Sequence, residues 1–148
     1  MIRKISKYDS LTNYNQAIKK LSDNGMRPTK QRMILAKLLF EKGDRHISAD
    51  ELYREVKIED REISLATIYN TLKQFTNLGL LKELVIDQNK SIYCSNHDSH
   101  YHLYIEDEGK IIDIPQKNID LNIPELPACL KFHDIDIIIR IRTLKEKY

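Results

Sequence analysis

Hydrophobic positions recur at steps of three and four along the first half of the chain, a spacing that places them on one side of an α-helix. The clearest example lies within residues 63–81, where the apolar stripe consists of Leu65, Ile68, Leu72, Phe75 and Leu78. Ser64 precedes the stripe and can cap the helix, because its hydroxyl can accept from an unpaired backbone N–H. Gly79 follows the stripe, where a left-handed residue commonly ends a helix.

Weaker patterns predict further helices before this one. We expect helices over about residues 11–24 and 29–40, with Pro28 in the first turn of the second. Ser48 and Glu51 form a capping-box pattern, in which each side chain satisfies a backbone donor of the other residue. This pattern begins a short third helix. Consecutive short helices that end in a polar-faced one indicate a helix-turn-helix.

The other side of the 63–81 helix has no acidic residue between Leu65 and Lys82. Its polar residues are Thr67, Tyr69, Asn70, Lys73, Gln74 and Asn77. A surface rich in hydrogen-bonding groups and lacking acids suits the DNA major groove. An ordinary solvated helix is the alternative.

After Leu81 the hydrophobic period changes. Residues on both sides of the turn at 87–90 predict a β-hairpin, namely Leu84, Ile86, Ile92 and Tyr93. A helix-turn-helix followed directly by a hairpin is a winged helix, with the hairpin as its wing. The pattern therefore favours a winged-helix DNA-binding domain, which we assign to residues 1–96.

Composition and charge agree with this division. Of the 148 residues, 41% are hydrophobic and 31% are charged, which is typical of a globular protein. The net charge is +2, but residues 1–83 hold 16 Lys/Arg and 11 Asp/Glu, whereas the remainder holds 8 and 11. The basic first part can meet phosphates, and the acidic second part has another role.

No apolar run approaches the roughly 20 residues that span a bilayer, and MIRKISKYDSL lacks the apolar core of a signal peptide. We therefore expect a cytoplasmic protein without membrane contact. The two cysteines, Cys94 and Cys129, form no C-x-x-C pair. This argues against a disulfide framework and excludes a four-cysteine zinc site within one chain.

Histidines gather in the segment NHDSHYHLY, at His97, His100 and His102. In a strand over about residues 99–106, His100 and His102 project from one face. Two imidazoles on one face suit a divalent metal, and neutral imidazole also ligates haem iron. Polar histidines on a solvated strand are the alternative.

A carboxylate is expected on the same face. A two-residue turn at Glu108-Gly109 would pair Tyr104 with Asp113, and Asp113 would then share the face of the two histidines. Two imidazoles and a carboxylate together suit Fe²⁺, Mn²⁺ or Zn²⁺.

Several segments, in order, resemble the Fur (ferric uptake regulator) family. They are MRPTKQRMIL, HISADELY, ISLATIYNTLKQFTNLGLL, the hairpin, the histidine cluster and GKIIDI, and they run from Gly25 to about Ile114. The resemblance implies an α+β fold, with an N-terminal winged helix-turn-helix followed by a small α/β dimerisation domain, here residues 97–148. It also implies a homodimeric transcription regulator that binds double-stranded DNA.

The resemblance and the polar helix face together suggest which residues contact DNA. They are Arg27, Thr29, Arg32, Ser64, Thr67, Tyr69, Asn70 and Lys73. Tyr69 stands at the tyrosine of the A-T-[VI]-Y motif, which contacts bases in the family. Asn70 stands where many members have arginine, so base readout is expected to differ from that of the ordinary Fur box.

Carried over by position, the family's regulatory metal site falls on His46, His100, His102 and Asp113. A fifth family ligand, a glutamate at the end of the wing, corresponds to Cys94. This cysteine can bind metal as a thiolate, which makes the site softer, or be a small buried hydrophobe. A metal that joins His46 to the strand residues would fix the angle between the two domains.

The chain departs from the family pattern at the structural zinc site, where Ile105 and Glu108 replace the usual C-x-x-C pair. We therefore expect this zinc to be absent and the dimer to be held by strand pairing and side-chain burial. The following segment, commonly helical, is interrupted by Pro124 and Pro127. The run from Ile135 to Ile141 then predicts a buried strand at the dimer core.

These departures resemble the Irr (iron response regulator) branch, which senses haem, or iron through haem. Its Cys-Pro haem motif is missing at Cys129, so haem would use His97, His100 and His102, with Tyr101 as a further candidate. The implied function is regulation of iron and haem homeostasis, and a haem-delivering protein remains unidentified. Direct sensing of Fe²⁺, Mn²⁺ or Zn²⁺, or of peroxide through that metal, is the alternative.

Other classes of function fit less well. The chain has no Ser-His-Asp set, glycine-rich phosphate loop or H-E-x-x-H motif, so we do not expect an enzyme. A winged helix that binds protein instead of DNA would fit the same fold. Such a protein-binding function predicts an affinity for the partner that is insensitive to salt. Contacts with DNA phosphates instead make the affinity fall steeply as salt rises.

Overall fold

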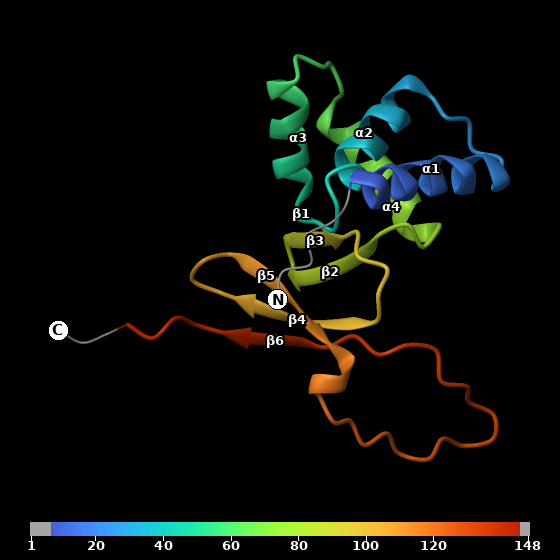
Figure 1. Ribbon diagram of the computed structural model, residues 1–148. Coiled ribbons are helices and arrows are strands. Elements are labelled where there is room, and N and C mark those ends of the chain that lie inside the picture. Colours follow the sequence, from blue (N-terminus) through green and yellow to red (C-terminus); the bar gives the residue numbers. More distant parts are fainter. Residues whose placement is uncertain (1–6, 146–148) are drawn as a thin grey trace. The chain divides into compact units, whose positions relative to one another are not determined.

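A computed structural model of the chain describes residues 7–145. The chain divides into two compact units, Met1–His97 and Asp98–Tyr148. Within the described residues, the first unit holds four α-helices and a three-stranded sheet. The second unit holds a separate three-stranded sheet (Figure 1). The predicted mixed fold, a winged helix-turn-helix followed by a smaller domain, is confirmed.

The helices of the first unit are α1 (Lys7–Asp23), α2 (Lys30–Phe40), α3 (Ala49–Ile58) and α4 (Leu65–Asn77). All four were expected, although α1 begins earlier than its hydrophobic pattern indicates. None of the helices in the described part of the chain is long and apolar enough to cross a membrane.

Local capping determines where three of these helices begin. Ser64 caps α4, and Ser48 with Glu51 forms the reciprocal capping box of α3, as predicted. The placement of Pro28 in the first turn of α2 is wrong. Thr29 is the N-cap, because its hydroxyl accepts from a backbone N–H of the first turn, and Pro28 lies before it.

The apolar faces of the helices meet in one core. From α4, the side chains of Ile68, Leu72 and Phe75 are completely buried. The ring centroids of Phe75 and of Phe40 in α2 lie 6.0 Å apart. Complete burial of each such side chain contributes about 1.5–3 kcal/mol. Gly79 ends the α4 segment with a φ of 72°, which favours glycine. The stripe thus holds α4 against the core and leaves its polar side outward.

The wing is the predicted hairpin of β2 (Lys82–Asp87) and β3 (Lys90–Cys94). A third strand, β1 (His46–Ile47), pairs antiparallel with β3, and the sheet order is β1-β3-β2. Strand β1 was not predicted, because two residues are too few to show a hydrophobic period. Its register places His46 opposite Cys94.

The sheet of the second unit has the order β5-β4-β6, formed by β4 (His100–Ile105), β5 (Lys110–Pro115) and β6 (Ile138–Ile141). Strand β4 is antiparallel to β5 and parallel to β6. The predicted pairing of Tyr104 with Asp113 is wrong. Asp113 lies opposite His102, because residues 106–109 all belong to the connection between the strands. The register differs by two positions, so Asp113 keeps the predicted face.

Between β5 and β6 the described chain contains one short 3-10 helix, Gln116–Asn118, and otherwise irregular backbone. The strand predicted over residues 135–141 is limited to β6. In the single chain Ile139 and Ile141 are 38% and 37% exposed, so the predicted burial is not found within one copy. Burial at a dimer core requires residues of a second copy.

Candidate functional site

Three potential ligand atoms converge in the second unit. Nε2 of His100 lies 2.9 Å from Nε2 of His102, and Oδ1 of Asp113 lies 3.3 Å and 3.4 Å from these two nitrogens. Both histidine side chains are almost completely buried, and that of Asp113 is 27% exposed. The register of β4 and β5 therefore brings together the two imidazoles and the carboxylate singled out in the sequence.

The spacing of these atoms fits a divalent metal. Ligands that lie about 2.0–2.1 Å from a tetrahedral zinc lie roughly 3.3 Å from one another, close to the three distances here. The ligand atoms also lie within 4.8 Å of one another. Imidazole nitrogen and carboxylate oxygen are ordinary donors for Zn²⁺, Mn²⁺ and Fe²⁺. The three side chains thus meet both the spacing and the chemistry of a metal centre.

A backbone group orients His100. Its Nδ1 lies within hydrogen-bonding distance of the carbonyl oxygen of Asp98. Because a carbonyl oxygen can only accept, Nδ1 is the donor, and Nε2 of the neutral ring keeps the lone pair that a metal requires. A bond of this kind from the second ring nitrogen is the usual support of a metal-ligating histidine.

A second pair of donors lies in the first unit. His46 and Cys94 are partners across β1 and β3, and their ligand atoms lie within 4.8 Å of each other. Cys94 is buried and forms no disulfide. Imidazole and thiolate are both good ligands for Zn²⁺ and other ions that accept sulfur. The pair therefore offers two candidate metal ligands, one nitrogen donor and one sulfur donor.

The remaining residues considered for haem do not share the arrangement of the two histidines on β4. His97 is exposed in the connection that follows β3. Tyr101 is buried and, because side chains alternate along a strand, lies on the opposite face of β4 from His100 and His102. Cys129 is exposed in the segment before β6. Of the haem candidates, His100 and His102 share one face of β4, with their Nε2 atoms 2.9 Å apart.

Helix α4 presents a polar surface in the first unit. Tyr69 is 46% exposed, and Asn70 and Lys73 are also exposed. Ser64 and Thr67 stand at the start of the helix, where Oγ of Ser64 accepts from the backbone N–H of Thr67 and donates to its hydroxyl. These two hydroxyls serve the cap, so the outward surface consists chiefly of Tyr69, Asn70 and Lys73.

Arg32 links α2 to the polar helix. Its Nε donates to Oε1 of Gln74 at 3.2 Å, and its Nη1 donates to the carbonyl oxygen of Arg27 at 2.9 Å. Oγ1 of Thr29 accepts from the backbone N–H of Arg32. Arg27, Thr29 and Arg32 are thus gathered at the start of α2. A guanidinium has five donors, so Arg32 retains donors that suit a phosphate.

Gln74 is a residue whose role the sequence did not reveal. It belongs to the polar face of α4, but its partner Arg32 lies 42 positions earlier in the chain. No local pattern indicates a contact over that separation, and only the packing of α2 against α4 brings the two side chains together.

A groove of about 440 Å³ lies between Tyr69 and the wing. The carboxylates of Asp50, Glu83 and Asp87 line it, together with Tyr93. Burial first, and then the nearby Glu83 and Tyr69, raise the pKa of Tyr93 to about 12, so its hydroxyl stays protonated. Because carboxylates repel phosphates, we expect phosphate contacts from the basic residues of α2 and α4 and not from this groove.

Comparison with known proteins identifies what the chain resembles. It matches the Ferric uptake regulator family over residues 23–142. The peroxide-responsive repressor PerR of Staphylococcus saprophyticus is 36% identical over 104 residues, which cover 70% of this chain and 70% of that repressor. The resemblance to the family is therefore confirmed, whereas the Irr branch has no counterpart among the relatives described here.

Solved structures agree. The Vibrio cholerae ferric uptake regulator aligns with a TM-score of 0.67 and 26% identity, over 85% of this chain and 98% of that one. A zinc-bound manganese uptake regulator aligns with a TM-score of 0.60 and 26% identity, over 86% and 98% of the two chains. The chain belongs to the ferric uptake regulator family, whose members are dimeric, DNA-binding, metal-responsive transcription regulators and not enzymes.

Proposed function

We propose that this chain regulates transcription by binding DNA with an affinity set by a bound divalent metal, Fe²⁺, Mn²⁺ or Zn²⁺. It responds to that metal directly or to peroxide through it. The observation that carries the proposal is the convergence of Nε2 of His100 and His102 on Oδ1 of Asp113. Similarity to a peroxide-responsive repressor and to a zinc-bound manganese uptake regulator supports the same class of regulator.

His100, His102 and Asp113 would hold the metal, and we assign His46 and Cys94 to the same ion, as the family resemblance implies. The ion would supply a positive charge that accepts an electron pair from each of the five donors. Because the donors come from both parts of the chain, metal binding favours the arrangement of the two units that satisfies every donor. DNA affinity then depends on the metal, since the DNA-binding residues lie in the first unit.

On the DNA, we assign base contacts to Tyr69 and Asn70 and phosphate contacts to Arg27, Arg32 and Lys73. Ser64 and Thr67 shape the start of α4, and Thr29 shapes the start of α2. The polar, acid-free outward surface of α4 supports this division. As a homodimer, the protein would present this surface twice, to two half-sites related by a two-fold axis.

Regulation by haem, and a dedicated role in iron and haem homeostasis, is the weaker candidate. It would use His97 together with His100 and His102, but His97 is exposed and belongs to the first unit, whereas the three converging donors belong to β4 and β5. The two relatives that support the proposal are a peroxide-responsive repressor and a zinc-bound manganese uptake regulator, and neither supports a response to haem.

The test is DNA binding by the purified protein, with DNA selected from a random pool. Fe²⁺, Mn²⁺, Zn²⁺, haem and a chelator are supplied in separate titrations. A divalent metal is expected to tighten binding and the chelator to reverse it. Peroxide should then release DNA from the Fe²⁺ form but not from the Zn²⁺ form, because Zn²⁺ has no redox chemistry. Binding that responds to haem alone would overturn the proposal.

A further inference from the structure

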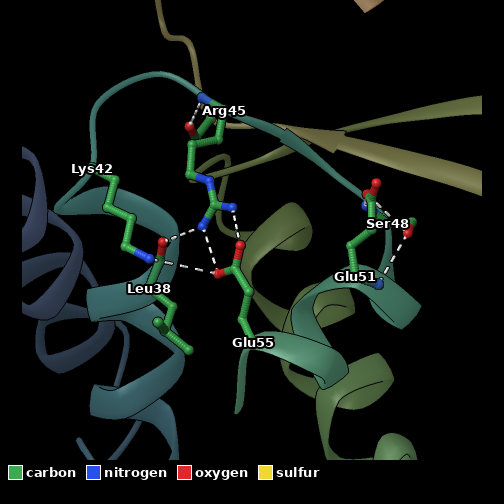
Figure 2. A network of polar contacts seen from close by, with 7 residues as sticks. Leu38, Lys42, Arg45, Ser48, Glu51 and Glu55 are labelled. Atoms are coloured by element: carbon green, nitrogen blue, oxygen red, sulfur yellow. Dashed lines mark hydrogen bonds and ion pairs between the residues drawn. The ribbon is translucent and has the colours of Figure 1, made fainter. Parts of the chain in front are cut away.

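A polar network joins strand β1 to the helices of the first unit (Figure 2). At its centre is Arg45, which immediately precedes His46. Nη1 of Arg45 donates to the carbonyl oxygen of Leu38 at 2.8 Å and to Oε2 of Glu55 at 2.9 Å. Nη2 of Arg45 donates to Oε1 of Glu55, so the pair is bidentate. Nζ of Lys42 lies 3.9 Å from the same carboxylate.

The backbone of Arg45 is bonded to Ser95, the residue after Cys94. The N–H of Arg45 donates to Oγ of Ser95 at 2.8 Å, and the N–H of Ser95 donates to the carbonyl oxygen of Arg45 at 3.0 Å. Ser95 is buried. These bonds continue the pairing of β1 with β3 by one position, directly beside the pair formed by His46 and Cys94. They therefore hold the two donors in register.

The side chains of Arg45 and His46 have different tasks, because successive side chains of an extended chain point to opposite sides. The guanidinium of Arg45 is directed toward α2 and α3 (Figure 2). The same alternation places the imidazole of His46 on the other side of the chain. The contacts of Arg45 are thus able to hold the backbone next to a candidate metal ligand.

The ion pair is well suited to this task. The side chains of Arg45 and Glu55 are only 19% and 27% exposed, and two parallel bonds fix the orientation of both groups. Hydrogen bonding to Arg45 holds the pKa of Glu55 below its usual range, although burial opposes this, so Glu55 is charged at neutral pH.

Glu55 also connects the network to α4, the helix that we propose reads the bases and call the recognition helix. It belongs to α3, whose Leu52 and Val56 lie in the same buried core as Ile68 and Leu72 of α4. Because protein cores are close-packed, a shift of α3 is transmitted to α4 and not absorbed between them. The path from the pair of donors to the DNA-binding surface therefore consists of contacts within one unit.

We propose that the Arg45–Glu55 ion pair positions the metal ligand His46 opposite Cys94 and couples metal binding at this pair to α3 and the recognition helix. The inference rests on the proposed function. It makes Arg45, Glu55 and Ser95 positioning residues. Loss of such support commonly lowers metal affinity by about 10–100-fold. It also lowers the ratio of DNA affinities with and without metal, which measures the coupling between the two sites.

The test uses the full chain with Co²⁺ as the probe metal. Sulfur-to-cobalt charge-transfer absorption reports ligation by the thiolate of Cys94, and fluorescence anisotropy reports DNA affinity with and without Co²⁺. Glu55→Gln removes the charge and keeps the shape of the side chain. Glu59→Gln, at an exposed position after α3, is the matched control. Arg45→Lys keeps the charge but loses the two-pronged contact.

Glu55→Gln is expected to weaken Co²⁺ binding by about tenfold or more, to reduce the charge-transfer absorption and to reduce the Co²⁺-dependent gain in DNA affinity. Arg45→Lys should be intermediate, and Glu59→Gln should match the wild type. A folded Glu55→Gln variant with wild-type Co²⁺ affinity and wild-type gain would overturn the inference.

If Glu55→Gln does not fold, Arg45→Lys decides in the same assays, because it keeps the charge and loses the two parallel bonds to Glu55. Loss of the charge-transfer absorption in Arg45→Lys supports the inference, and wild-type behaviour refutes it. The wild-type protein tests the proposed function separately. If its DNA binding does not respond to any divalent metal, the proposed function fails, whatever the variants do.

Discussion

His102 and Asp113 lie opposite each other on β4 and β5, with Nε2 and Oδ1 3.4 Å apart. Cross-strand partners project from the same face of a sheet, so this single pairing places the carboxylate beside both histidines of β4. A slip of one residue would move Asp113 to the opposite face. The convergence of these three candidate ligands therefore depends on strand register as much as on the choice of donors.

Asp113→Asn should remove the charged donor while keeping the size of the side chain. We expect metal affinity to fall by about two orders of magnitude, because loss even of groups that only support ligands costs about 10–100-fold. Isothermal titration with Mn²⁺ and with Zn²⁺ measures the change. Asp120→Asn, an exposed position of the same unit, should leave affinity unchanged. Equal affinities of the two variants would exclude Asp113 from the site.

His100→Ala combined with His102→Ala should abolish the metal response of DNA binding and leave the fold intact. The two imidazoles are two of the five proposed donors, and without them Asp113 is the only proposed donor left in the second unit. Anisotropy titrations with and without metal, together with circular dichroism, separate loss of response from loss of structure. A double variant that still responds fully would disprove the assignment.

Tyr69→Ala should weaken binding to the selected DNA by about 1–3 kcal/mol, the usual contribution of a base contact. The exposed phenol stands on the outward surface of α4 and contributes little to the core, so dimerisation and thermal stability should be unchanged. Tyr69→Phe distinguishes the hydroxyl from the ring. Wild-type affinity of Tyr69→Ala in competition titrations would show that α4 does not read the bases.

Arg32→Gln should weaken binding to selected and random DNA alike, because phosphate contacts carry no sequence information. The slope of log affinity against log salt should become less steep by about one. Arg54→Gln, at an exposed position of α3, provides the control for the loss of a positive charge. An unchanged salt slope for Arg32→Gln would mean that its guanidinium serves only the contacts with Gln74 and Arg27.

Glu83→Gln combined with Asp87→Asn should strengthen DNA binding. Both carboxylates line the groove beside Tyr69, and their removal reduces repulsion of the phosphate backbone. The gain should shrink as salt rises, because exposed charges are screened over about 10 Å at 0.1 M salt. Anisotropy over a salt series measures it. A loss of affinity would indicate that these side chains contact bases or order the wing.

Glu55→Gln should also change the dependence of stability on pH. The folded-state pKa of Glu55 is lowered from 4.5, chiefly by the hydrogen bond to Arg45. A lowered carboxyl pKa contributes stability above about pH 4.5 that disappears as pH falls through the folded-state value. The difference in unfolding free energy between wild type and variant should therefore be largest near neutral pH and shrink in acid. A difference independent of pH would contradict this.

Much of the first unit could be predicted from local sequence. The stripe through Ile68, Leu72 and Phe75 and the caps at Ser48 and Ser64 are correct, since these signals act within one or two helical turns. The shared face of His100, His102 and Asp113 also follows from strand alternation, even though the expected register was two positions wrong. Family motifs added the assignment of His46, for which no local pattern exists.

The remaining features join residues that are distant in the chain. Three such features depend on how packed helices and strands meet. They are the pairing of His46 with Cys94, the contact of Arg32 with Gln74, and the connection of β1 to α3 through Arg45. Periodicity and capping act through neighbours three or four positions away, and so they determine which elements form. Which side chains then meet is decided by the packing of those elements in three dimensions, because a long-range contact leaves no periodic trace in the sequence.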